Sequence, residues 1–115
     1  MTQFENIGSE FELRTPVMVL AFEGWNDAGE SATGAVAHLL NCWPHSKIAD
    51  CDPEDFYDFQ VNRPTVKVDT NVVREIHWPN TTVYGVSTPH LDHDFIIVKG
   101  IEPSMRWKTF ANSLL

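Results

Sequence analysis

The sequence predicts an α/β fold built on a mixed, mainly parallel sheet. Two short apolar runs have the length and composition of buried strands, PVMVLAF at 16–22 and FIIVK at 95–99. Each run is followed by a segment in which apolar residues recur with helical spacing, and residues that alternate between polar and apolar lie in the middle of the chain. A helix between two strands usually forms a crossover between parallel strands of one sheet.

The first strand is expected over 16–22, and a helix follows it. The apolar run ends just before Gly24, and from Asp27 onward the apolar residues fall on one helical face. Pro44 ends this helix. A second short strand over 47–49 then leads into the acidic turn CDPEDFYDF.

The start of this helix has the glycine spacing of a phosphate-binding loop but not its lysine. Gly24, Gly29 and Ser31 match the glycines and the hydroxyl of GxxxxGK[ST], whereas Glu30 holds the lysine position. Asp27 and Glu30 instead have the spacing of an N-cap and a capping-box glutamate. Because carboxylates here satisfy the positive end of the helix, we favour the cap over a phosphate site.

The second half of the chain predicts a hairpin, two further strands and a last helix. TVKVD at 65–69 and VVREIHW at 72–78 alternate around a turn, and a strand can follow at 81–86. The run at 95–99 is expected to be a central parallel strand, and 107–114 again has helical spacing. No glycine or proline follows that helix, so we expect an incomplete domain.

Composition narrows the class of protein. The 115 residues carry a net charge of −8, which disfavours binding to nucleic acid and to anionic membranes. No apolar run approaches the ~20 residues that span a bilayer, and the N-terminus does not resemble a signal peptide. We therefore expect a cytoplasmic protein with no nucleic-acid or membrane partner.

The two cysteines are expected to be free thiols. Cys42 falls at the end of the first helix and Cys51 at the end of the second strand, on opposite edges of the sheet. A strand of about five residues separates those edges by ~16 Å, whereas a disulfide needs Cα atoms within about 7 Å.

Polar and aromatic side chains follow three of the predicted strands, at the carboxyl ends where open α/β sheets place ligands. The candidate cleft or partner-binding residues are Gly24, Trp25, Asn26, Asp27, Asp58, Arg63, Glu102, Arg106 and Trp107. They could bind a polar small molecule or a peptide segment. In the alternative interpretation, Asp58 and Glu102 pair with Arg63 and Arg106 and only lock the loops together.

No catalytic constellation can be assigned, so the catalytic residues are unknown and no cofactor is expected. His38 and His77 have no serine or cysteine near them in the sequence that would make a catalytic pair. PHLDHDF at 89–95 has histidines and aspartates at spacings that can bind a metal, but no second cluster completes a ligand shell, and we expect no metal site.

Four blocks carry a resemblance to a known family. FEGWNDAGESATGAVAHLL, DPEDFYDFQVNRPTV, REIHWP and GIEPSMRWKTF occur in this order and together resemble the PAC2 family, named after a proteasome assembly chaperone subunit, and most closely its actinobacterial branch. The resemblance implies a three-layer α/β/α sandwich related to phosphorylase and peptidyl-hydrolase folds. It also implies homo-oligomers, and it implies that residues 1–115 form the N-terminal part of a longer single domain.

Two functions follow as expectations. The first is a non-enzymatic assembly factor or scaffold that self-associates and binds a protein partner, which the resemblance suggests is proteasome-related. The second is a small-molecule binder or enzyme, ligase-like or phosphorylase-like, that uses the cleft at the strand ends.

Overall fold

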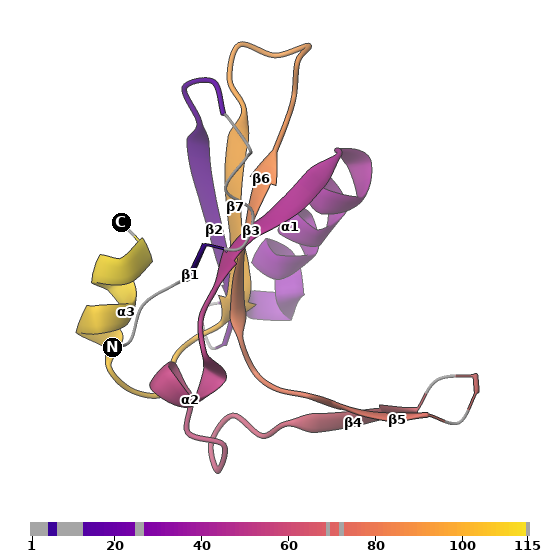
Figure 1. The fold of residues 1–115 in the computed structure, drawn as a ribbon, viewed down its shortest axis with the longest axis vertical. Helices are drawn as coiled ribbons and strands as arrows, with labels where there is room; N and C mark the ends of the chain where they lie inside the picture. Colours follow the sequence, from indigo (N-terminus) through magenta and orange to yellow (C-terminus); the bar gives the residue numbers. More distant parts are fainter. Residues whose placement is uncertain (1–4, 7–12, 25–26, 69, 72, 115) are drawn as a thin grey trace.

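The computed structural model of the chain describes residues 5–6, 13–24, 27–68, 70–71 and 73–114 (Figure 1). Among these residues, five strands form one sheet, and a separate two-stranded hairpin projects from one end of the body. In sheet order the five strands are β1 (Glu5–Asn6), β3 (His45–Asp50), β6 (Thr81–Val86), β7 (Phe95–Ile101) and β2 (Val17–Glu23).

The prediction of a mainly parallel sheet is wrong. Among the described strands, only β2 and β7 pair in parallel, whereas β6 is antiparallel to both β7 and β3, and β1 is antiparallel to β3. The strands β2, β3 and β7 nevertheless run in the same direction. The short connection 87–94 lets the chain turn back from β6 into β7, and this pair lies between β2 and β3. The sequence does not reveal that β6 and β7 lie between β3 and β2, because this order depends on contacts between strands that are far apart in the chain.

Helices cover both faces of the sheet (Figure 1). Helix α1 (Ser31–Cys42) packs on one face, where the buried residues are Ala21, Val36, Leu40, Val86 and Ile97. Helix α3 (Trp107–Leu114) lies on the other face, and its Phe110 meets Phe22 of β2 edge to face. Coverage on both sides explains why the β7 run is almost continuously apolar, with Ile97 and Val98 fully buried.

The predicted hairpin is confirmed, and it forms an arm. Its strands β4 (Thr65–Val68) and β5 (Arg74–His77) pair antiparallel, and all eight of their residues are exposed. Figure 1 shows the arm extending away from the body. The turn residues Asp69 and Val72 lie outside the described residues.

The remaining predicted elements are confirmed, with small shifts at their ends. The helix predicted from Asp27 begins with a 3-10 turn (Ala28–Glu30) and continues as α1 to Cys42, just before Pro44. The short helix α2 (Pro53–Phe56) and strand β1 were not predicted. Both are too short to give a periodic pattern in the sequence.

The cysteine prediction is also confirmed. Both thiols are free, and Cys42 is exposed whereas Cys51 is buried. The Cys51 thiol donates a hydrogen bond to Asn80 Oδ1 at 2.9 Å. Burial raises the pKa of Cys51 to about 11, so this thiol stays protonated at neutral pH.

A buried carboxylate closes the end of the sheet where β2 and β7 begin. Asp94 accepts hydrogen bonds from the backbone N–H groups of Arg14 and Thr88, both at 2.9 Å, and from the Arg14 guanidinium at 3.0 Å. Arg14 also donates to the carbonyl oxygens of Thr88 and Leu91. These bonds, that of the Arg14 side chain first, hold the pKa of Asp94 well below its usual range.

Candidate functional site

The loops that follow β2, β3 and β7 meet at one end of the sheet, as their common direction requires. The backbone N–H of Glu102 donates to the carbonyl of Glu23, which joins the loop after β7 to the end of β2. The N–H groups of Ser104 and Met105 donate to the carbonyl of Phe56, which joins the same loop to α2. The segments that the sequence places far apart therefore form one rim.

A buried tyrosine fixes this rim to the sheet. Tyr57 follows α2, and its hydroxyl lies 2.6 Å from Thr81 Oγ1 and donates to the carbonyl of Ile101 at 2.7 Å. Burial raises the pKa of Tyr57. Gly100 faces Thr81, because a Cβ atom at Gly100 would lie 2.6 Å from the Thr81 Cα. Tyr57 is thus an anchor for the loops and is not accessible to a ligand.

A cavity of about 310 Å³ that is open to solvent lies at the rim, and we call it the rim cavity. Its lining residues are Glu23, Gly24, Val61, Asn62, Ile101, Glu102, Pro103 and Ser104. Ser104 Oγ donates to Asn62 Oδ1, which connects two of the loops. Gly24 has φ = 153°, a backbone conformation that favours glycine, and it faces the Glu102 side chain, because a Cβ atom at Gly24 would lie 2.5 Å from Glu102 Oε2.

Two of the predicted site residues, Gly24 and Glu102, line the rim cavity, but Asp27 does not. The Asp27 carboxylate is buried and accepts hydrogen bonds from the backbone N–H groups of Ala32 and Thr33 and from Thr33 Oγ1. The Thr33 hydroxyl bond, first among these, lowers the pKa of Asp27. Asp27 therefore caps α1 itself, in the place that a phosphate would occupy.

The predicted capping box is wrong in its second half. Glu30 adopts a left-handed conformation with φ = 58° directly before α1, and its side chain makes no capping hydrogen bond. The 3-10 turn puts Asp27 within reach of the second and third residues of α1, so one carboxylate satisfies both donors.

The other predicted residues lie elsewhere on the surface. Asp58 uses its carboxylate to accept the N–H of Gln60, which shapes its own loop. Arg63, Arg106 and Trp107 are exposed and do not line the rim cavity. Trp25 and Asn26 lie outside the described residues.

The alternative interpretation, in which Asp58 and Glu102 form ion pairs with Arg63 and Arg106, is not observed among the described residues. The ion pairs between described residues join Arg14 to Asp94, Lys47 to Asp50 and His77 to Glu75. None of them involves either predicted pair of the loops.

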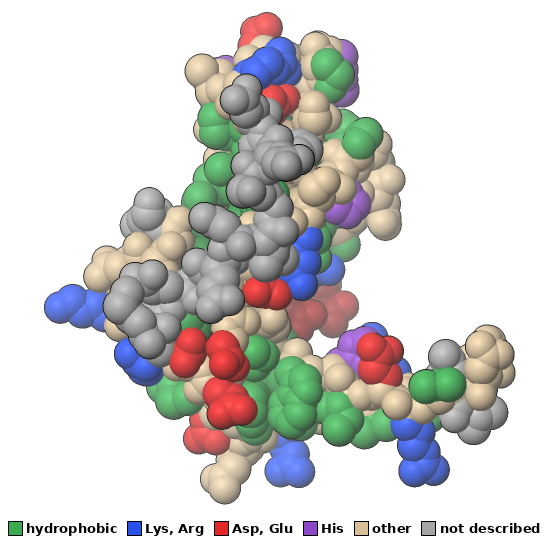
Figure 2. Space-filling view, viewed as in Figure 1, with side chains coloured by type: hydrophobic (Ala, Val, Ile, Leu, Met, Phe, Trp, Pro, Cys, Tyr) green, Lys and Arg blue, Asp and Glu red, His purple; other side chains and the backbone are tan. Residues whose placement is uncertain are grey.

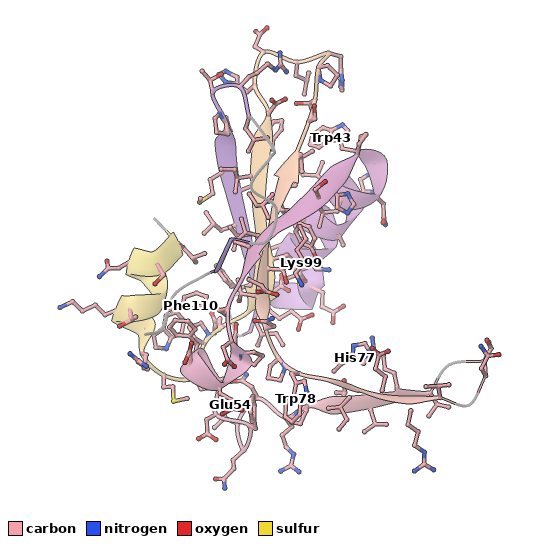
Figure 3. All side chains as sticks on the ribbon, in the orientation of Figure 1. Trp43, Glu54, His77, Trp78, Lys99 and Phe110 are labelled. Atoms are coloured by element: carbon pink, nitrogen blue, oxygen red, sulfur yellow. The ribbon has the colours of Figure 1, made fainter. Side chains whose placement is uncertain are left out.

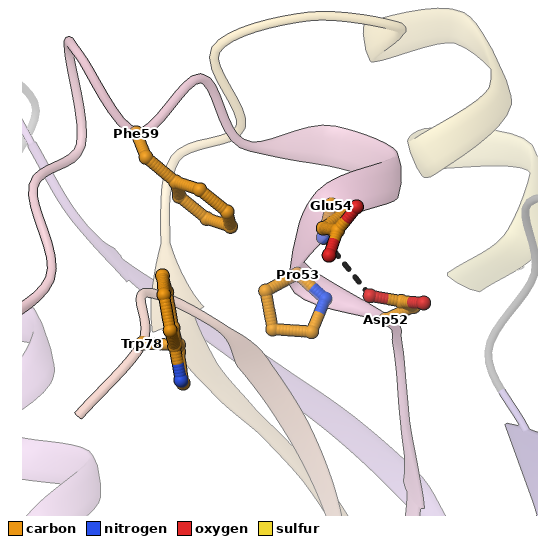
Figure 4. Close-up of a pocket in the computed structure, with 5 residues that line it drawn as sticks. All are labelled: Asp52, Pro53, Glu54, Phe59 and Trp78. Atoms are coloured by element: carbon orange, nitrogen blue, oxygen red, sulfur yellow. Dashed lines mark hydrogen bonds between the residues drawn. The ribbon is translucent and has the colours of Figure 1, made fainter. Parts of the chain in front are cut away.

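A second cavity, of about 260 Å³, lies where the arm joins the body, and we call it the arm-base pocket (Figure 4). Asp52, Pro53, Glu54, Phe59 and Trp78 line it. The rings of Phe59 and Trp78 lie 4.9 Å apart between centroids and are tilted by 48°. Sequence reasoning missed both aromatic residues. Phe59 precedes the predicted hairpin and Trp78 is its last residue, and no pattern in the sequence around them indicates a pocket.

The arm presents one face that is apolar except for Arg74, and we call it the apolar face. In the antiparallel register Val66 is opposite Ile76 and Val68 is opposite Arg74, so these four side chains share a face. Val66 is 61% exposed, Val68 57% and Ile76 54%. The opposite face carries polar and charged side chains, those of Thr65, Lys67, Glu75 and His77. Figure 2 shows hydrophobic side chains along the arm.

The expectation that His38 has no thiol partner is wrong. His38 and Cys42 are four residues apart on α1, and His38 Nε2 lies 3.4 Å from Cys42 Sγ. Both side chains are exposed on the helix surface, and neither lines the rim cavity or the arm-base pocket.

Two of the four histidines and aspartates in 89–95, His93 and Asp94, have structural partners. The His93 ring lies 3.0 Å from the Thr15 hydroxyl and 2.9 Å from its carbonyl, and Asp94 is held by Arg14. In the part of the chain that the structure describes, no three histidine, cysteine or acidic side chains come close enough to hold a metal ion. Over the same residues, none of the helices has the length and apolar character needed to cross a bilayer.

Comparison with known proteins gives a family. The sequence profile described as "PAC2 family" matches residues 21–115, which is most of the chain. The chain belongs to the PAC2 family. No curated protein shows significant similarity to it.

Solved structures of actinobacterial proteins share both sequence and fold with this PAC2 chain. A PAC2 family protein from Streptomyces avermitilis is 55% identical over 86% of the chain, with a TM-score of 0.77. A proteasome-assembly chaperone homologue from Mycobacterium tuberculosis is 45% identical over 84% of it, with a TM-score of 0.76. A protein of unknown function from Corynebacterium glutamicum is 25% identical over 97% of it, with a TM-score of 0.83.

The match covers 42%, 41% and 43% of the Streptomyces, Mycobacterium and Corynebacterium proteins, respectively. The chain therefore spans about two fifths of the length of these relatives, and it matches their N-terminal portion.

Proposed function

We propose that this chain acts as a non-enzymatic assembly factor in the cytoplasm, which self-associates and binds a protein partner through the arm. The observation that carries the proposal is the exposed apolar face of β4 and β5. Scattered single apolar residues are normal on a surface, but Val66, Val68 and Ile76 are contiguous on one projecting element. Contiguous exposed apolar side chains are typical of surfaces that contact another protein.

The name of one relative supports a particular partner. The Mycobacterium protein is described as a proteasome-assembly chaperone homologue, and it shares 45% identity with this chain. We infer that the partner is a proteasome-related subunit and that the arm contributes to the contact.

The test measures association when the arm face is changed. Sedimentation of the chain at micromolar concentration, alone and mixed with purified actinobacterial proteasome subunits, should show species larger than the monomer. The double variant Val66→Thr, Ile76→Thr keeps strand-forming side chains but removes apolar surface, so it should weaken association about tenfold or more.

The matched control changes two residues on the other face of the same strands. The double variant Lys67→Thr, His77→Thr should associate as the unchanged chain does. A monomer that binds no subunit, or equal association by both double variants, would contradict the proposal.

The rim cavity favours a second candidate function, binding of a polar small molecule. Its lining combines two carboxylates, Glu23 and Glu102, with the polar side chains of Asn62 and Ser104. Its volume of about 310 Å³ lies at the lower end of the range for ligand sites. The phosphorylase- and hydrolase-type folds to which the sequence resemblance points would suit such a ligand.

A thermal-shift screen of nucleotides and amino acids tests this candidate. A ligand that raises the melting temperature of the unchanged chain but not of Glu102→Gln would support it. No shift with any compound would count against a small-molecule role.

A further inference from the structure

We propose that the arm-base pocket binds an arginine or lysine side chain of the protein partner. The proposal rests on the proposed function, because the partner is the one that the arm contacts. The partner would place a long basic side chain, flanked by apolar residues, at the base of the arm.

The lining of the pocket has two parts. Trp78 and Phe59 form an aromatic wall on one side, and the carboxylates of Asp52 and Glu54 lie on the other, with Pro53 between them (Figure 4). An arginine or lysine side chain also has two parts, an apolar stem and a charged head. The stem would pack on Pro53 and the aromatic rings while the head reaches the carboxylates.

Both carboxylates are exposed and take no part in the ion pairs between described residues. Asp52 Oδ1 accepts the backbone N–H of Glu54 at 3.0 Å and thereby caps α2. An ionised carboxylate can accept about four hydrogen bonds, so this cap leaves Asp52 able to accept more. A guanidinium or ammonium group makes charge-assisted hydrogen bonds to carboxylates of this kind.

The surroundings also favour a cation. The chain carries a net charge of −8, which attracts positive groups and repels anionic ligands. Trp78 is half-exposed, and tryptophan offers the most favourable ring face for a cation. The cavity of about 260 Å³ is below the roughly 300–1,000 Å³ of small-molecule sites, which suits a single side chain.

The position of the pocket connects it to the arm. Trp78 is two residues beyond Ile76, whose side chain lies on the apolar face, and Figure 3 shows Trp78 at the base of the hairpin and Glu54 on α2 beside it. A partner segment that runs along the apolar face toward the body would therefore place its next side chain at this pocket.

The experiment titrates two peptides against the isotope-labelled chain and follows amide and indole signals by NMR. The probe is acetyl-Leu-Arg-Leu-amide, and its control is the same peptide with citrulline, which has the shape of arginine without the charge. We expect the arginine peptide to shift the Trp78 indole signal and the Asp52 and Glu54 amides. It should bind about tenfold more tightly than the citrulline peptide, with a preference that falls as salt is added.

A pair of double variants separates the pocket from a general charge effect. Asp52→Asn, Glu54→Gln should reduce the arginine peptide to the affinity of the citrulline peptide. Glu23→Gln, Glu102→Gln removes the same two charges at the rim cavity and should leave the preference intact. Equal binding of both peptides, no binding of either at millimolar concentration, or equal loss in both double variants would overturn the proposal.

The outcome is independent of the test of the proposed function. If the arginine preference is found but the arm variants associate normally, the proposed function fails and the pocket stands. If the arm variants lose association but the peptides bind equally, the pocket fails and the proposed function stands.

Discussion

Strands β4 and β6 have similar sequences and opposite surroundings. β4 reads TVKV and lies fully exposed in the arm, whereas β6 reads TTVYGV and has four of its six residues buried between β3 and β7. Val66 is 61% exposed, but Val86 is completely buried. The local sequence pattern is therefore enough to predict a strand. Whether the side chains of that strand stabilise the fold or remain exposed to a partner depends on the elements that pack against it.

The largest effect is expected where the body is most tightly packed. Gly100→Ala would place a Cβ atom 2.1 Å from Thr81 Oγ1 and 2.6 Å from Thr81 Cα, so β6 and β7 would have to move apart. We expect a loss of about 3 kcal/mol or more in the free energy of unfolding, measured by urea denaturation.

Gly34→Ala is the matched control for this change. Gly34 lies within α1 and has no atom within 4 Å of the added Cβ, so the variant should gain roughly 0.5–1 kcal/mol from helix propensity. A Gly100→Ala chain as stable as the unchanged one would show that β6 is held less firmly than its burial indicates.

A smaller loss of stability is expected when a valine is shortened to alanine, and its size should differ between the body and the arm. Val98→Ala removes a fully buried side chain from β7 and should cost about 2 kcal/mol. Val66→Ala in the arm should change stability by less than about 0.5 kcal/mol. Urea denaturation of both variants measures the difference, and equal losses would mean that the arm packs against the body.

The charge pairs of the two regions should differ in their response to acid. The pKa of Asp94 is held below its usual value in the folded chain, so its contribution to stability is complete above about pH 4, the pKa of an unfolded aspartate. That contribution is lost as the pH falls further, toward the folded pKa. Asp94→Asn should therefore lower stability at neutral pH and flatten the loss of stability below about pH 4.

The corresponding change in the arm is Glu75→Gln. Glu75 is exposed and lies 3.6 Å from His77, so the variant should leave the acid response unchanged. Denaturation midpoints measured from pH 7 to pH 2 test both variants. A steep acid transition retained by Asp94→Asn would place its origin elsewhere in the chain.

Most of the fold could be predicted from the sequence, because apolar runs and helical spacing report locally on burial. The strands at 16–22 and 95–99 and the helix before Pro44 follow from such patterns, and so does the hairpin. Strand order could not be predicted, since β6 enters between β3 and β7 through contacts that depend on the whole sheet. The mainly parallel sheet was inferred from sequence neighbours, and tertiary pairing overruled it.

The candidate site was predicted in outline and not in detail. Gly24 and Glu102 come together because β2 and β7 run in the same direction, which the sequence does indicate. The sequence predicts that Asp27 both faces the cleft and caps the helix. In the structure its carboxylate accepts three hydrogen bonds from α1, so it caps the helix and does not face the cleft. Trp78 was missed because nothing in HWP distinguishes an aromatic that covers the core from one that lines a pocket.

The sequence by itself determined where the longer strands and helices form, that the thiols stay apart, and that the loops after β2, β3 and β7 share one edge. These follow from steric preferences and chain direction, which act over a few residues. Only the tertiary structure decided which strands are neighbours, which carboxylates are already bound, and that the arm stands clear of the core. Those outcomes depend on contacts between residues far apart in the chain, and burial of apolar surface selects among them only when the whole body has assembled.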